Sequence, residues 1–184
     1  MASKPTITRT ETIAHTRLFR VEQVGLRFAN GREVSYERLR SASSGAVLVV
    51  PMLDEVTVLL IREYAAGVDR YELALPKGRI EEGESGVEAA NREIMEEIGY
   101  GARRLTPLKT MTLAPGYFSH ATQIVLAEDL YPQRLEGDEP EAIEVVPWPL
   151  HKLAELCAHE ECTEARSIAA LFMVRDQLTR KHRG

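Results

Sequence analysis

The chain has 184 residues, 44% of them hydrophobic and 28% charged, which is ordinary usage for a globular protein with one substantial core. A formal net charge of −5 and a pI near 5.6 exclude a general electrostatic attraction to nucleic acid. Two cysteines, Cys157 and Cys162, exclude a disulfide framework and lack the paired spacing of a zinc site. With no apolar leader and no run of about 18 apolar residues, we expect a cytoplasmic protein without membrane contact.

The predicted elements begin with a hairpin at residues 19–38, where strand-like flanks surround the turn Asn30-Gly31. Short apolar runs then predict strands, and a turn at Asp54-Glu55 separates the first two. These runs cover residues 45–52, 56–61 and 71–75. Weaker strand patterns cover about 104–113, 121–127 and 143–147, and helical spacing covers 150–158 and 163–181.

The clearest helix runs from Ser85 to Gly99. Ser85 can cap the first turn, and Glu88 completes a capping box three residues later. Gly99 supplies the C-terminal stop. Strands around one strong central helix, with two terminal helices, predict an α/β fold: an α/β/α sandwich around a mixed sheet. Residues 1–44 are expected to form an N-terminal antiparallel β extension, and residues 45–184 the main domain.

The central helix carries an acidic face. On an ideal helix Glu93, Glu96 and Glu97 share an arc of about 100°. Ile94 and Ile98 fall beside that arc, so the helix is expected to bury one stripe and leave its carboxylates at the edge of the core. Like charges four residues apart cost about 0.2–0.5 kcal/mol even on an exposed helix, and partial burial adds to that cost. Hard divalent cations such as Mg²⁺ or Mn²⁺ would remove the repulsion.

A solvated helix face is the common explanation of a glutamate run, but the spacing here is specific. The stretch from residue 78 to 100 fits the pattern G-x5-E-x7-R-E-U-x-E-E-x-G-U, where U is apolar. At about 7% for each of seven fixed positions, a chance match is on the order of 10⁻⁸ per starting point. The positions are Gly78, Glu84, Arg92, Glu93, Glu96, Glu97 and Gly99, with Ile94 as the first apolar residue. Tyr100 stands where an aliphatic residue is usual.

This pattern resembles the signature of the Nudix hydrolases. The resemblance implies a Nudix-type fold whose loop–helix–loop binds two or more Mg²⁺ or Mn²⁺ ions. Glu93 and Glu97 would be the principal metal ligands, and Glu96 would be an additional one. Glu96 and Glu97 would also take part in the catalytic step. A carbonyl near Lys77–Gly78 would complete the site, while Glu84 and Arg92 would hold the loop to the helix and Gly78 and Gly99 would shape its ends.

Residues 78–100, which carry this pattern, are called the box below. Segments around the box resemble the ADP-compounds hydrolase (NudE-type) branch, among them YERLR, LIREYAAG, YELALPKG, APGYFS and LEGDEPE. That resemblance implies a homodimer with exchanged or packed N-terminal sheets. It also implies cleavage of ADP-ribose, NADH or short diadenosine polyphosphates to AMP and the other phosphate half. Relatives that cleave ADP-ribose usually carry an acidic residue shortly after the Pro-Gly, whereas Tyr117 to His120 follow Pro115-Gly116 here. His120 is expected to be structural.

Relatives often place the general base in a loop before the last strand. The acidic loop 136–141 suits that position, so Glu139 is the expected base and Glu141 a possible metal ligand; a merely solvated loop is the alternative. Pro140 restricts Glu139 to extended backbone, which could aim it inward. Four residues are the expected substrate contacts. Arg62, directly after an apolar strand, and Glu72 precede the box, Arg79 lies at its start, and Tyr117 follows Pro115-Gly116.

Three other functions remain open at this point. A nucleotide-sugar diphosphatase acting on GDP- or UDP-sugars would use the same box. A non-catalytic nucleotide sensor would usually lose box carboxylates or add a DNA-binding helix-turn-helix, and neither change is seen. Decapping of NAD-capped RNA would ordinarily come with a four-cysteine zinc module, which two cysteines cannot supply.

Overall fold

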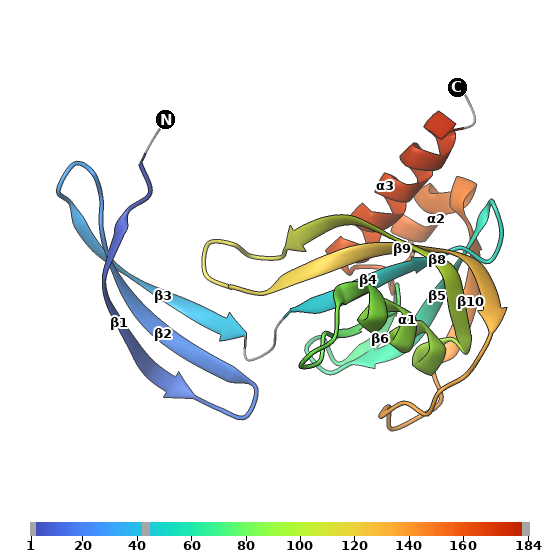
Figure 1. Cartoon of the computed structure of the whole chain (residues 1–184), viewed down its shortest axis with the longest axis horizontal. Coiled ribbons are helices and arrows are strands. Elements are labelled where there is room, and N and C mark those ends of the chain that lie inside the picture. The colour runs from blue at the N-terminus through green and yellow to red at the C-terminus, as the bar shows by residue number, and fades with distance from the viewer. Residues whose placement is uncertain (1–2, 42–44, 182–184) are drawn as a thin grey trace.

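The structure is a computed structural model, and it describes residues 3–41 and 45–181. An N-terminal sheet projects from a larger α/β body (Figure 1). The predicted boundary between extension and main domain, at residue 44, lies outside the described residues. In the described part of the chain, no helix combines the length and apolar character that crossing a membrane requires.

Three antiparallel strands in the order β1-β2-β3 form the N-terminal sheet, and they are β1 (Thr6–His15), β2 (Phe19–Arg27) and β3 (Glu33–Ser41). The predicted hairpin is therefore confirmed, with Gly31 in the left-handed region at φ 81° in its turn. The first strand escaped prediction because every residue of β1 is exposed, so no alternation of buried and exposed positions marks it.

The main body contains two sheets. The mixed sheet has the order β7-β4-β9-β8, with β4 and β9 parallel; its strands are β4 (Ala46–Pro51), β7 (Lys77–Arg79), β8 (Tyr100–Thr112) and β9 (Ala121–Pro132). The antiparallel sheet has the order β10-β5-β6, and its strands are β5 (Thr57–Ala65), β6 (Arg70–Ala74) and β10 (Glu144–Pro149).

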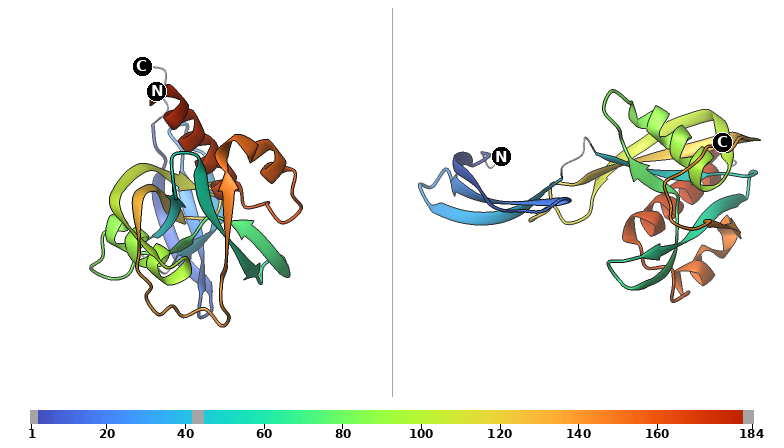
Figure 2. Two further views of the ribbon diagram at one scale, coloured as in Figure 1. Left: turned by 90° about the vertical axis from the view of Figure 1, so that its right-hand side faces the viewer. Right: turned by 90° about the horizontal axis from the view of Figure 1, so that it is seen from below.

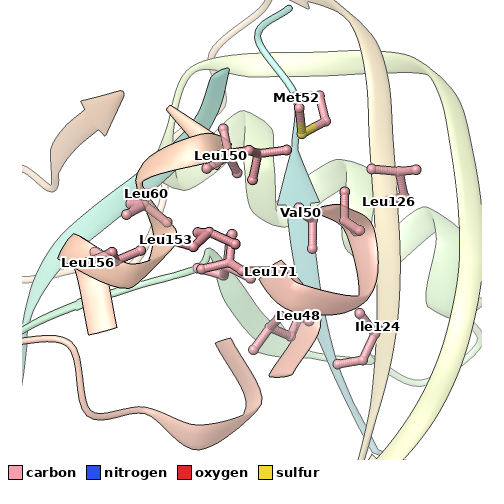
Figure 3. Packing of buried hydrophobic residues seen from close by; sticks show 14 of the residues in the cluster. Leu48, Val50, Met52, Leu60, Ile124, Leu126, Leu150, Leu153, Leu156 and Leu171 are labelled. Carbon is pink, nitrogen blue, oxygen red and sulfur yellow. The ribbon is translucent and has the colours of Figure 1, made fainter. Parts of the chain in front are cut away.

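Helices cover the strands from two sides (Figure 2). On one side lies α1 (Gly86–Glu97); on the other lie α2 (Leu153–Cys157), preceded by a 3₁₀ turn (Leu150–Lys152), and α3 (Ala165–Lys181). Alternate residues of β4 serve the two layers, since Val47 and Val49 pack toward α1, and Leu48 and Val50 pack toward α2 and α3 (Figure 3). The predicted α/β/α sandwich is confirmed, with its strands divided between two sheets.

The predicted start and end of the central helix are also confirmed. Ser85 Oγ accepts a hydrogen bond from the backbone N–H of Glu88, and the Glu88 carboxylate accepts one from the backbone N–H of Ser85. Gly99 follows the helix at φ 75°, where a side chain would be strained. The chain then enters β8 at once, which is why that strand begins four residues before the predicted one.

Candidate active site

The acidic face of α1 lies at the rim of the core. Glu93 and Glu97 are 7% and 3% exposed, although both are carboxylates, while Glu96 is half-buried. Ile94 and Ile98 anchor the adjacent stripe in the core against β4, β5 and β9. The 3.6-residue period therefore brings a packing stripe and a carboxylate pair to neighbouring positions on one helix.

Burial makes this pair difficult to ionise in the ion-free protein. Removal from water raises the pKa of Glu97 to about 9, opposed by the Lys77 ammonium and reinforced by the charges of Glu93 and Glu63. Burial also raises the pKa of Glu93, and Arg92 opposes that shift. Buried carboxylates with strongly raised pKa values are concentrated at functional sites.

Arg92 connects the helix to the preceding loop. Its Nε and Nη2 atoms donate to the two oxygens of Glu84 at 3.0 and 3.1 Å, and Nη2 also donates to the carbonyl of Arg79 at 2.9 Å. Its Nη1 donates to Glu93 at 2.8 Å and to Glu96 at 2.9 Å. These contacts raise the pKa of Arg92, so its charge is permanent. The loop and helix are thus fastened through one guanidinium.

Gly78 allows the β7 backbone to approach Glu93 closely. A Cβ atom at this position would lie 1.9 Å from the Glu93 carboxylate carbon, far inside van der Waals contact. The neighbouring backbone N–H of Lys77 donates to Glu97 at 3.1 Å. The short strand β7, unpredicted from sequence, therefore presents backbone to both buried carboxylates.

The donor set fits a hard divalent cation. Mg²⁺ and Mn²⁺ prefer carboxylate and carbonyl oxygens as ligands. The carboxylates of α1 lie beside the backbone of β7, which carries such carbonyl groups. Among the described residues, no three acidic, imidazole or thiolate groups converge closely enough to form a closed metal cage. In this arrangement the carboxylates of Glu93 and Glu96 are instead bridged by Arg92.

The acidic loop places Glu139 and Glu141 differently. Glu139 is half-buried on the loop whose start is fastened to the C-terminal end of α1, and its charge is the last of several causes that raise the pKa of Glu93. Glu141 is exposed, and its carboxylate accepts a hydrogen bond from the Tyr71 hydroxyl at 2.7 Å. The structure thus holds Glu141 at β6, while Glu139 lies on the part of the loop between α1 and that contact.

The predicted substrate contacts near β5 and β6 have internal partners. Arg62 is paired with Glu144 at 2.5 Å and with Glu161 at 3.0 Å. Glu72 is buried and accepts hydrogen bonds from the backbone N–H and hydroxyl of Thr163, as well as from Arg70. These pairs fasten the segment after α2 to the sheet. Arg79 is exposed, and its own backbone carbonyl accepts the hydrogen bond from Arg92.

Tyr117 lies against the N-terminal sheet. It is 61% exposed, and its carbonyl accepts a hydrogen bond from Leu39 of β3 at 2.7 Å. A cavity of about 330 Å³ separates this loop from apolar side chains of the sheet, including Val24 and Phe28. His120 stacks on Phe118, and burial lowers its pKa, as befits a structural residue. The structure therefore does not bring Tyr117 to the acidic face of its own chain.

Sequence reasoning missed Glu63 and the side chain of Lys77, of which only the backbone had been expected at the site. The Lys77 ammonium is paired with Glu63 at 2.8 Å, and both charges act on Glu97. A signal was present for Glu63, because Ile61 packs toward α1 and strand alternation sends residue 63 to the same face. For Lys77, the signal was its position immediately before Gly78, the first glycine of the 78–100 pattern.

Comparisons with known proteins agree with this geometry. A model of the NUDIX domain matches residues 43–172, and a model of the NudE-type Nudix hydrolase N-terminal domain matches residues 5–38. The chain is 51% identical over 175 residues to ADP compounds hydrolase NudE of Escherichia coli (strain K12), covering 95% of this chain and 94% of that protein. It is 28% identical over 168 residues to ADP-ribose pyrophosphatase of Bacillus subtilis (strain 168), covering 88% and 90%.

A crystal structure of an ADP compounds hydrolase superposes with a TM-score of 0.90 at 48% identity, covering 100% of this chain and 99% of the other. The match therefore includes both the N-terminal sheet and the body that carries the acidic helix. With its box, its fold and its N-terminal module in agreement, the chain belongs to the Nudix hydrolases, in the branch with a NudE-type N-terminal domain.

Proposed function

We propose that this chain hydrolyses the diphosphate bond of ADP compounds in a Mg²⁺-dependent reaction. ADP-ribose, NADH and diadenosine di- or triphosphate are the proposed substrates, and AMP and the other phosphate half are the products. The observation that carries the proposal is the buried pair Glu93 and Glu97 beside the glycine backbone of β7. The names of the Escherichia coli and Bacillus subtilis relatives support the ADP moiety.

The roles follow from the contacts. Glu93 and Glu97 would hold the cations, with Glu96 as an additional ligand, and two or more Mg²⁺ or Mn²⁺ ions would be engaged. Such ions neutralise the diphosphate oxygens and make water more acidic when they are bound. Arg92 fixes the loop to the helix, so that the ligands keep their places during turnover.

Glu139 is the proposed proton acceptor. It lies on a loop outside the helix, its charge acts on Glu93, and from that loop it would face a water molecule attacking the diphosphate. We do not assign Glu141 to the metal, because its carboxylate is bonded to Tyr71. Arg62 and Glu72 have partners within the chain, whereas Arg79 is an exposed cation at the start of the box and is the proposed substrate contact.

We further propose a cytoplasmic homodimer in which residues 1–44 form the contact module and residues 45–184 the hydrolase domain. All ten residues of β1 are exposed, and β1 is an edge strand of its sheet. The sheet also exposes large apolar side chains, among them Ile7, Ile13, Phe19 and Tyr36, each at least 45% exposed. An exposed edge strand beside exposed apolar side chains is a surface on which a second copy of the chain would pack.

The test is hydrolysis in ¹⁸O-labelled water, with mass analysis of both products. ADP-ribose with Mg²⁺ should give AMP and ribose phosphate, and Glu97→Gln should lower kcat by at least about 100-fold. Release of labelled product from GDP- or UDP-sugars in preference would select the nucleotide-sugar alternative. If ADP-ribose, NADH and diadenosine triphosphate all stay intact, the proposal fails and a nucleotide-sensing role becomes the better account.

A further inference from the structure

The connection from β9 to β10, residues 133–143, is a strap that runs from the C-terminal end of α1 to the antiparallel sheet and is fastened at both ends. At its start, the backbone N–H of Gln133 donates to the carbonyl of Gly99 at 3.0 Å, and that of Leu135 donates to Met95 at 3.1 Å. Arg134 adds a hydrogen bond to the carbonyl of Glu96 at 3.3 Å. The first part of the strap is therefore attached to the C-terminal end of α1.

The far end of the strap is attached to the antiparallel sheet. Tyr71 of β6 donates its hydroxyl to Glu141 at 2.7 Å, and Arg62 of β5 pairs with Glu144. Between the two attachments, residues 136–139 have no regular secondary structure. Glu139 lies in this free part, two residues before Glu141, so the place of Glu139 depends on where the strap is fastened.

Tyr71 is itself well fixed. Its ring meets the ring of Tyr64, its partner across β5 and β6, edge to face at a centroid distance of 5.7 Å. The hydrogen bond to Glu141 raises the pKa of Tyr71, so the hydroxyl keeps its proton and remains a donor under ordinary assay conditions. Pro140, between the anchor and Glu139, limits how far the strap can bend at that point.

We propose that Tyr71 is a positioning residue for the hydrolytic reaction, which acts by holding Glu141 and thereby placing Glu139 over the acidic face. The inference rests on the proposed function, since it needs Glu139 as proton acceptor. Tyr71 touches neither the substrate nor the reacting atoms in this account. Its contribution is orientation, and a misplacement of about 1 Å at a reacting group can cost on the order of 100-fold in rate.

The test is steady-state kinetics of ADP-ribose hydrolysis by Tyr71→Phe, which deletes the hydroxyl and keeps the ring. We expect kcat to fall roughly 10- to 100-fold while KM changes less than about threefold. Tyr64→Phe is the matched control: Tyr64 is equally exposed, and its hydroxyl also donates to a carboxylate, but to Asp69, which is outside the strap. Its kcat should stay near that of the unmodified chain.

Two further comparisons separate positioning from general damage. In a Glu139→Gln background, adding Tyr71→Phe should cause little extra loss, because both changes act on the same group. Glu141→Ala should lower kcat about as much as Tyr71→Phe does. Glu141→Gln keeps an acceptor oxygen, so its kcat should be closer to that of the unmodified chain. Unchanged kcat in Tyr71→Phe, or full additivity with Glu139→Gln, overturns the inference while leaving the proposed function in place. An inactive unmodified chain overturns both.

Discussion

Glu97 illustrates how burial and cation binding are linked at a single position. In the ion-free protein its pKa of about 9 lies above the ordinary glutamate value of 4.5. Between these two values the folded chain keeps a proton that the unfolded chain has lost, so this group makes the ion-free protein less stable as pH rises. A bound cation favours the ionised carboxylate instead. Cation binding near neutral pH must therefore expel a proton.

Gly78 must lack a side chain because the Glu93 carboxylate occupies the space that a Cβ atom would need. Gly78→Ala places a methyl group where the Glu93 carboxylate now lies, and the flexible side chain must swing aside. We expect kcat/KM for ADP-ribose to fall by roughly 100-fold, since the ligand is displaced, while the free energy of unfolding changes by about 1 kcal/mol. Kinetics and urea denaturation on the same sample check both parts.

Gly67→Ala provides the matched control for that substitution. Gly67 lies between β5 and β6, and a Cβ atom there would have open space around it. Its activity should match that of the unmodified chain. Equal activity of the Gly78 and Gly67 variants would mean that the close approach of β7 to Glu93 has no part in catalysis.

At the scale of elements, local pattern predicted well wherever a segment is buried on a regular period. The capping box at Ser85, the stop at Gly99 and the stripe of Ile94 and Ile98 all follow from residues near one another in the chain. The same period placed Glu93 beside Glu97. Geometry within one helix can therefore be predicted from spacing alone.

Contacts between elements were harder to predict. Arg62 follows an apolar strand, which suggested a phosphate contact; its pairing with Glu144, set by the register of β5 and β10, was not foreseen. Glu141 was expected as a possible metal ligand, and its hydrogen bond with Tyr71 of β6 was not foreseen either. These partners lie about 70 to 100 residues away in the chain, and no local periodicity encodes such a meeting.

For the whole molecule, the main question is what stabilises the projecting N-terminal sheet, because β1 is not buried within its own chain. A strand exposed along its full length gains little from burial within its own chain. We expect the protein to sediment as a dimer, at twice the 20.6 kDa of one chain. Ile13→Glu, on β1, should raise the dimer dissociation constant by at least about tenfold, because it puts a charge into the contact.

Analytical ultracentrifugation across a range of protein concentrations measures that constant. Val68→Glu, at an exposed apolar residue in the turn between β5 and β6, is the control that should leave it unchanged. A monomer at all concentrations would contradict the dimer. Equal effects of Ile13→Glu and Val68→Glu on the dissociation constant would also contradict it, since the contact would then lie away from the N-terminal sheet.

The buried pair Glu93 and Glu97 as a cation site is the claim on which the other assignments depend. Isothermal titration of Mn²⁺ or Mg²⁺ into the ion-free protein at pH 7, repeated in buffers of different ionisation enthalpy, tests it directly. We predict binding that releases about one proton per chain, since Glu97 must ionise, and loss of both binding and proton release in Glu97→Gln. Absence of binding, or binding that Glu97→Gln leaves unaltered, would contradict this account.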